Sequence, residues 1–350
     1  MHKARRNILA SVPSLAMGCS TYKPSEQPAS TALTRIAFGS CNDQNRPQTI
    51  WPIIEATKPD LFIFGGDNVY ASGAQFQIQD LTKAYSKLAA DTSFSEFRKR
   101  VPHLAIWDDH DYCINDGGAQ WPYKQAAKDE FLKFWNIGIA DARHQHEGLY
   151  FAETFGASNH RVQIIFLDTR WWRSPWRITD QRNAPGKERY LPDPDPAKTM
   201  LGEAQWQWLE EQLNQPAKIR LIVSSIQTIT LGHGWESWAL LPLEKTRLFN
   251  TVARTKAKGV IFLSGDRHIG ALYKETSATP YPFYEMTSSG LTHAWAQANE
   301  AGPNRLGALV TKNHFGLCDF NWSNDSLTLS LLTEDGQKSE SHTISIKELA

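Results

Sequence analysis

One short stretch of the chain, Leu61-Phe62-Ile63-Phe64, is wholly apolar and is followed at once by Gly65-Gly66-Asp67. A short apolar run that is rich in β-branched and aromatic residues and ends at glycines predicts a buried strand followed by a tight turn. Such a strand would present Asp67 at its carboxyl end, where open α/β sheets bind their ligands. Taken alone, the pattern also fits an ordinary turn in which Asp67 caps the next helix.

The same arrangement recurs along the chain. Segments with helical spacing separate the apolar runs, and strands that alternate with helices predict an α/β fold. The sequence contains no internal linker or repeat, so we expect residues 35–350 to form one domain. The other apolar runs lead directly into Ser40-Cys41, Asp109-His110, Asp168-Thr169-Arg170 and Asp266-Arg267-His268.

Residues 1–34 have the features of an export signal followed by a tether. Basic residues precede a mildly apolar stretch, residues 8–18, that is too short to span a bilayer. Arg5-Arg6 resembles a twin-arginine signal, and residues 16–19 resemble a lipoprotein cleavage site that would place a lipid on Cys19. We therefore expect export to the periplasm or cell surface, with membrane anchoring through Cys19 left open. The alternative is an extension of a cytoplasmic enzyme.

The overall charge argues against some classes of partner. The chain carries 37 basic and 37 acidic side chains, so its formal net charge is zero. A neutral balance gives no electrostatic reason to expect nucleic acid or a membrane surface as the main partner. We expect a monomer that acts on a small molecule. The 13 Trp and 10 Tyr residues suit both a core and a pocket that stacks on ligands.

The groups that follow the predicted strands suit metal ions. Carboxylates, imidazoles, one thiol and the phenol of Tyr70 form a donor set for metals rather than an acyl-transfer triad. Two metals roughly 4 Å apart can activate water and support an in-line displacement at phosphorus. Asp67 is the natural bridging carboxylate because it lies between the other ligand sets along the chain. Arg170 could hold phosphate oxygens through its planar fork of donors.

Five segments carry a resemblance to a known family when they are taken in order: Gly39-Ser40-Cys41, Gly66-Asp67-Asn68-Val69-Tyr70, Trp107-Asp108-Asp109-His110-Asp111, Asp168-Thr169-Arg170 and Ser264-Gly265-Asp266-Arg267-His268. They resemble the motifs of the PhoD-type alkaline phosphatases, a branch of the calcineurin-like metallophosphoesterases. The resemblance runs from about residue 35 to residue 322. It implies a two-sheet sandwich flanked by helices, with metals at the sheet edge. It also implies hydrolysis of phosphate monoesters, diesters or both through in-line attack by a metal-bound hydroxide.

The resemblance also implies roles for individual residues. The family's centre holds a ferric ion with calcium, and Zn²⁺ or Mn²⁺ are alternatives. His110 would protonate the leaving oxygen or stabilise the transition state, and Asp111 would orient its imidazole. Phenolate and thiolate ligands suit iron, whereas sites built from oxygen alone suit calcium. The implied sets are Cys41, Asp67, Tyr70 and His268 for iron and Asp67, Asp109 and Asp266 for calcium, and Asn115 matches a family asparagine that would reach metal or phosphate. We further expect Glu236 and His293 to lie on the substrate side rather than to be ligands.

Several alternatives stay open at this point. Cys41 could be a plain buried thiol, Tyr70 a packing residue and Arg170 a structural ion pair. Residues 173–201 form either a solvated loop or a lid, in which basic residues beside Trp171, Trp172 and Trp176 would suit an aromatic or sugar group. Cys113 stands where relatives usually carry glycine. The alternative functions are a phosphodiesterase or phospholipase D-like enzyme acting on phospholipid or nucleotide-type diesters, and a non-catalytic lipoprotein that binds phosphate or metal.

Overall fold

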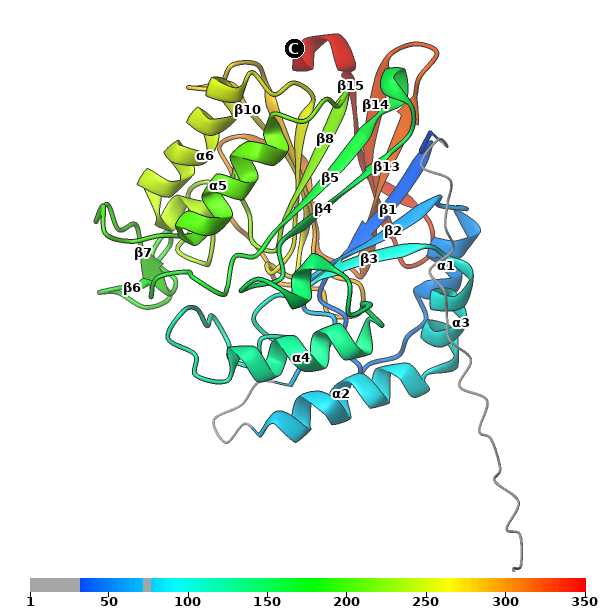
Figure 1. Ribbon diagram of the computed structural model, residues 1–350, viewed down its shortest axis with the longest axis vertical. Coiled ribbons are helices and arrows are strands. Elements are labelled where there is room, and N and C mark those ends of the chain that lie inside the picture. The colour runs from blue at the N-terminus through cyan, green and yellow to red at the C-terminus, as the bar shows by residue number, and fades with distance from the viewer. Residues whose placement is uncertain (1–31, 72–76) are drawn as a thin grey trace, which may run out of the picture.

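The computed structural model describes residues 32–71 and 77–350. These residues form two mixed β-sheets with helices on their outer sides, which confirms the predicted sandwich (Figure 1). The predicted signal, the Cys19 lipidation site and most of the tether lie outside the described residues. None of the helices in the described ranges combines the length and apolar character needed to cross a bilayer.

The first sheet has six strands and contains the apolar run Leu61–Phe64. Its strands β1, β2 and β3 are parallel, and β13 joins β1 in the antiparallel sense. Every residue of β2 is buried, as its continuous apolar run predicts. In spatial order the strands are β15 (Lys338–Ser345), β14 (Ser326–Thr333), β13 (His314–Asn321), β1 (Arg35–Gly39), β2 (Leu61–Gly65) and β3 (His103–Ile106).

The second sheet has seven strands. Strands β5, β8, β9 and β11 are parallel, and β4 forms an antiparallel pair with β5. In spatial order the strands are β12 (Arg305–Val310), β10 (Gly270–Glu275), β11 (Phe283–Ser288), β9 (Val260–Ser264), β8 (Ile219–Ser224), β5 (Val162–Leu167) and β4 (Phe151–Phe155).

Helices cover the sandwich on two sides, with α1 to α3 beside the first sheet and α5 and α6 beside the second (Figure 1). The helical pattern of residues 78–100 forms two helices, because Asp91 leaves the helical conformation and its carboxylate caps the second helix at Phe94 N–H. The α-helices are α1 (Trp51–Ala56), α2 (Ile78–Ala90), α3 (Thr92–Arg100), α4 (Lys124–Phe134), α5 (Gly202–Leu213) and α6 (Pro242–Thr255). Short 3₁₀ turns are Ala142–His144, Ser158–His160, Trp238–Leu240 and Ile346–Leu349.

Aromatic side chains join the helices to the first sheet. The indole of Trp51 in α1 is fully buried and lies within 6 Å, between ring centroids, of two rings of β2 and two rings of α3. Contacts of this kind add about 0.5–1.5 kcal/mol each beyond simple burial. They make a rigid support for the turns that follow β1 and β2.

The carboxyl ends of the parallel strands of both sheets meet at one edge of the sandwich. Ser40, directly after β1, donates its backbone N–H to the carbonyl of Ser288 at the end of β11 (3.0 Å). Leu291 N–H in turn donates to the Ser40 carbonyl (3.0 Å). These bonds connect the two sheets where the predicted ligands leave their strands.

Candidate metal centre and active site

Four of the predicted metal ligands have a left-handed backbone conformation. The φ angles are 58° at Cys41, 49° at Asp67, 70° at Asp266 and 56° at His268. Side chains other than glycine rarely adopt this region, and such residues concentrate at functional sites where the surrounding structure enforces them. Each strand therefore ends in a sharp turn that directs its donor toward the shared edge.

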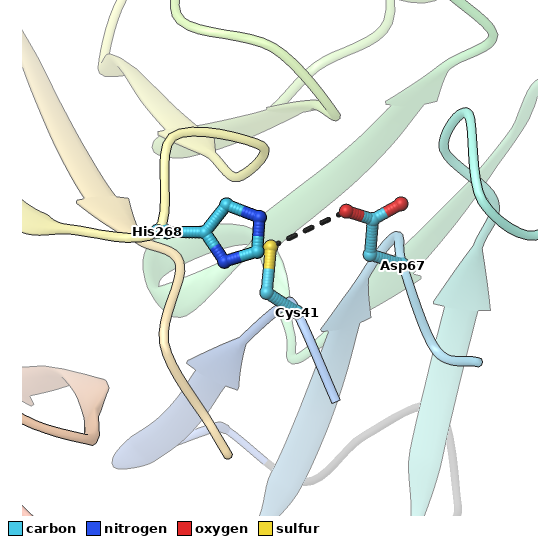
Figure 2. A group of neighbouring side chains, drawn as sticks. All are labelled: Cys41, Asp67 and His268. Atoms are coloured by element: carbon cyan, nitrogen blue, oxygen red, sulfur yellow. Dashed lines mark hydrogen bonds between the residues drawn. The ribbon is translucent and has the colours of Figure 1, made fainter. Parts of the chain in front are cut away.

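A first group of donors consists of Cys41, Asp67 and His268, whose candidate ligand atoms all lie within 4.8 Å of one another. Figure 2 shows the three side chains converging from the ends of β1 and β2 and from the loop after β9. The Cys41 thiol donates to Asp67 Oδ2 at 3.4 Å, and the Tyr70 hydroxyl donates to the same oxygen at 3.3 Å. The structure thus brings together the four residues predicted to hold iron.

Two further groups adjoin the first. Asp67 also lies with Asp109 and His110, and Asp109 lies with Asp266, Asp116 and Glu236, again with ligand atoms within 4.8 Å. The three residues predicted to hold calcium therefore belong to overlapping groups around the same edge. Asp116 was not among the predicted ligands; its backbone N–H donates to Asp109 Oδ2 at 2.7 Å.

The electrostatics of these acids fit a bound cation. Burial and the neighbouring Asp109 raise the pKa of Asp67 well above its ordinary value, and burial and Glu236 do the same to the pKa of Asp266. Burial raises the pKa of Glu236 to about 8. Asp109 Oδ1 and Glu236 Oε2 are buried and accept no hydrogen bond from any described residue. Buried acceptors of this kind need a partner, and a metal ion supplies one.

His110 and Asp111 occupy different environments. The His110 ring lies in the cavity wall, 4.2 Å from the Tyr70 ring between centroids, and its backbone N–H donates to Asp67 Oδ1 at 3.2 Å. The Asp111 carboxylate is buried and accepts hydrogen bonds from the backbone N–H groups of Asn68 and Asp108 and from the Tyr85 hydroxyl. These bonds fix the turn that carries His110. That Asp111 orients the imidazole stays a prediction.

Arg170 is fully buried and bound to protein acids. Its Nε donates to Asp108 Oδ1 at 2.6 Å and its Nη1 to Glu236 Oε1 at 2.9 Å. Arg170 is not among the described residues that line the cavity. This geometry favours the alternative role, a structural ion pair, over direct contact with phosphate.

A cavity of about 470 Å³ opens at the sheet edge over the donor groups. The three residues predicted on the substrate side, Asn115, Glu236 and His293, all line it. Sequence reasoning missed several other lining residues because no apolar strand directly precedes most of them. These are Arg46, Asp116, Arg189, Trp235, Arg267 and the segment 294–297.

Segment 173–201 contains a short hairpin of β6 (Arg177–Ile178) and β7 (Tyr190–Leu191). It is not simply a solvated loop, because Arg173 at its start is fully buried and donates to the Asp116 and Gly117 carbonyls. Near its end, Arg189 forms part of the cavity wall.

A family model described as PhoD-like phosphatase matches residues 36–321, which is most of the chain. The chain belongs to the PhoD-like phosphatase family. Alkaline phosphatase D of Bacillus subtilis (strain 168) is 22% identical over 270 residues, which are 67% of this chain but 45% of that protein. The chain thus spans less than half the length of this curated relative.

Solved structures share the fold of this PhoD-like phosphatase. A structure of PhoD matches with a TM-score of 0.68 and 17% identity, covering 90% of this chain and 69% of that one. GAP50, described as the anchor in the inner membrane complex of Plasmodium, matches with a TM-score of 0.55 and 12% identity, covering 90% of this chain and 89% of that one. At such identities the matches establish the architecture alone.

The PhoD-like chain carries a buried histidine, His314, that is bonded to the loop beside two of the predicted ligands. Its Nε2 accepts the Ser289 N–H at 3.1 Å and its Nδ1 bonds the Lys312 carbonyl at 2.8 Å, so the ring is held neutral. Ser289 Oγ in turn accepts the His268 N–H at 2.8 Å and lies 3.1 Å from Cys41 Sγ. His314 therefore positions a serine that contacts two predicted ligands.

We expect acid to weaken the protein through His314. Burial lowers the pKa of His314 from 6.5 to about 4, so on acidification the unfolded chain takes up a proton first. The contribution of His314 to the free energy of unfolding does not change above pH 6.5 and falls between pH 6.5 and 4, by about 3 kcal/mol for a shift of this size. Urea unfolding between pH 6.5 and 4 measures this loss in the free energy of unfolding. The loss should be about 3 kcal/mol smaller in His314→Gln than in wild type. Parallel curves for the two proteins would contradict this assignment.

Proposed function

We propose that this chain is a metal-dependent phosphoric ester hydrolase that acts on small phosphate esters. The observation that carries the proposal is the convergence of three overlapping donor groups on one cavity in a member of the PhoD-like phosphatase family. Asp67 belongs to the first two groups and Asp109 to the last two. Shared carboxylates of this kind suit neighbouring cations that act on one phosphoryl group.

We assign the ligands by their chemistry. Cys41, Asp67, Tyr70 and His268 would hold a ferric ion, and Asp67 with Asp109 and Asp266 would hold calcium, with Zn²⁺ or Mn²⁺ as alternatives. Bound there, the cations would stabilise charge on the phosphoryl oxygens and make water a stronger nucleophile at neutral pH.

The chain's own residues would do the remaining work. The His110 imidazole, in the cavity wall, is placed to give a proton to the leaving oxygen. General acid catalysis of this kind typically raises the rate by about 10²- to 10⁴-fold. The amide of Asn115, also in the wall, can orient the ester. Arg170 contributes indirectly, because its ion pairs fix Asp108 and Glu236.

The decisive experiment compares p-nitrophenyl phosphate with bis-p-nitrophenyl phosphate, each with and without prolonged chelation. We expect chelation to abolish turnover of whichever ester is cleaved and metal replacement to restore it. Activity that survives complete removal of metal would refute the proposal. Preference for the diester would select the first alternative, a diesterase acting on phospholipid or nucleotide-type esters.

A spectroscopic test addresses the iron assignment separately. A ferric ion bound by the Tyr70 phenolate absorbs visible light, so the purified protein should be coloured and Tyr70→Phe should lose the band. Tyr123→Phe is the matched control, because Tyr123 is 53% exposed and does not line the cavity. A colourless, iron-free and fully active protein would rule out iron while leaving hydrolysis in place.

The alternative from another class is a non-catalytic lipoprotein that binds phosphate or metal. The match to GAP50, an anchor by its description, illustrates that this fold is not in itself evidence of catalysis. The presence of His110 beside a complete donor set favours the enzyme, since a binding protein has no use for a general acid. Metal binding without turnover of any ester would favour the alternative.

We also propose export to the periplasm or cell surface through residues 1–34, with residues 35–350 as the catalytic domain and the protein acting as a monomer without a nucleic-acid partner. Anchoring through a lipid on Cys19 is the finer version of this proposal. Mass spectrometry of the mature N-terminus, with Cys19→Ser as the control, distinguishes a lipidated from a freely exported protein.

A further inference from the structure

The largest exposed aromatic ring at the cavity belongs to Trp295. Its side chain is 37% exposed and lines the cavity on the loop that follows β11. The backbone N–H of Trp295 donates to the carbonyl of His268 at 2.7 Å, and its own carbonyl accepts from Ala298 at 3.1 Å. The indole is therefore carried by a turn whose backbone is bonded directly to a predicted metal ligand.

A second tryptophan supports this ring. Trp235 meets Trp295 edge to face, with centroids 5.8 Å apart and planes at 79°. The guanidinium carbons of Arg189 and Arg267 lie 4.8 Å and 4.6 Å from the centre of the Trp235 ring, within cation–π range. Trp235 is thus occupied by protein partners, whereas Trp295 presents open surface to the cavity.

The arginines around the cavity are already paired with acids. Arg189 bonds Asp116 at 2.8 Å, and Arg267 is paired with Glu300. Arg46, which also lines the cavity, bonds Asp43, three residues before it, at 3.3 Å. These pairs reduce the positive charge offered to a ligand, so the wall favours an uncharged leaving group over one that carries a second anion.

We propose that Trp295 forms the wall of a leaving-group subsite, and that the enzyme prefers phosphate esters whose leaving group carries a flat aromatic ring. This inference rests on the proposed phosphoesterase function and specifies its substrate class. An exposed indole in the wall of the cavity that holds the donor groups can stack on an aromatic ring of the leaving group and gains little from a short alkyl group. Trp235 is a positioning residue, because its edge-to-face contact holds the Trp295 ring in place.

The subsite differs from the aromatic group predicted from the sequence. Trp171 and Trp176 are buried, and the indole N–H of Trp176 donates to Glu236. Trp172 packs on Gly202 and Tyr150. None of these three is among the described residues that line the cavity, so selection for an aromatic group falls to Trp295.

The test measures binding as well as turnover in the metal-loaded, full-length protein. Calorimetry with phenylphosphonate and methylphosphonate, which are not hydrolysed, should show that wild type binds the phenyl compound more tightly. Trp295→Ala should weaken phenylphosphonate about tenfold and leave methylphosphonate unchanged, whereas Trp295→Phe should retain most of the preference. Tyr123→Ala, an exposed aromatic residue outside the cavity, is the control and should change neither.

The kinetic arm uses the ratio of kcat/KM for phenyl phosphate to that for ethyl phosphate. Each substrate is compared with itself across variants, so intrinsic leaving-group reactivity cancels, and Trp295→Ala should lower the ratio about tenfold. Adenosine 5′-monophosphate against ribose 5-phosphate shows whether a nucleobase reaches the same wall. Equal binding of the two phosphonates by wild type, or equal loss of both in Trp295→Ala, would overturn the inference. Selective phosphonate binding without turnover of any ester would instead contradict the proposed function and leave the aromatic subsite standing.

Discussion

Replacing Asp67 by asparagine is expected to lower kcat/KM for p-nitrophenyl phosphate by about a thousandfold or more. Asp67 belongs to two donor groups and accepts hydrogen bonds from both Cys41 and Tyr70. An asparagine keeps the shape of the side chain but removes the charge that would be shared between cations. Losing several kcal/mol of charge stabilisation in the transition state corresponds to this drop in rate.

The same substitution should not lower the thermal stability of the metal-free protein. Burial and Asp109 raise the pKa of Asp67, so the ionised carboxylate is disfavoured in the empty fold. We therefore expect Asp67→Asn to match or exceed the thermal stability of wild type after chelation, yet to lose the stabilisation that metal gives wild type. A variant that is equally destabilised with and without metal would show that Asp67 is structural.

Replacing Arg170 by methionine is expected to destabilise the protein by about 3–5 kcal/mol, since it strands two buried carboxylates. Both partners, Asp108 and Glu236, are at most 2% exposed. The control is Arg254→Met, which breaks an exposed ion pair with Glu210 and should change the free energy of unfolding little. Equilibrium unfolding in urea measures both.

The Arg170 experiment also decides between its two proposed roles. If Arg170 holds the substrate's phosphate, Arg170→Met should fold with nearly wild-type stability and raise KM. If it is the structural ion pair that its burial favours, the loss should appear mainly as stability. The outcome is read from unfolding and kinetics on the same preparations.

The ends of the strands could be predicted from the sequence because their signal is local. At β2, four apolar residues, two glycines and Asp67 follow one another within seven positions, and the structure forms a buried strand and a left-handed turn there. The turns before Cys41 and Asp266 follow the same rule. That these turns would meet at one edge follows from parallel strands in both sheets, which the resemblance to a family implied.

Other parts depend on contacts between distant segments and had no local signal. Asp116 comes to the centre because its N–H bonds Asp109, and Arg189 because it bonds Asp116 from a hairpin 73 residues further along the chain. The burial of Arg170 reflects two acids, Asp108 and Glu236, whose proximity no spacing reveals. Strands β10 and β11 were also not predicted, since the apolar run of β10 is only three residues long after Gly270 and Glu285 interrupts that of β11.

Ligands from both sheets surround the same point: Cys41, Asp67 and Asp109 follow strands of the six-stranded sheet, whereas Asp266 and His268 follow a strand of the seven-stranded one. A cation bound there would link the two sheets through ligands from both of them. Binding and removal of the metal would then change the stability of the packing between the two sheets, as well as the chemistry at this edge. Amide hydrogen exchange in β1 and in β9, one strand from each sheet, would then slow together when metal is bound.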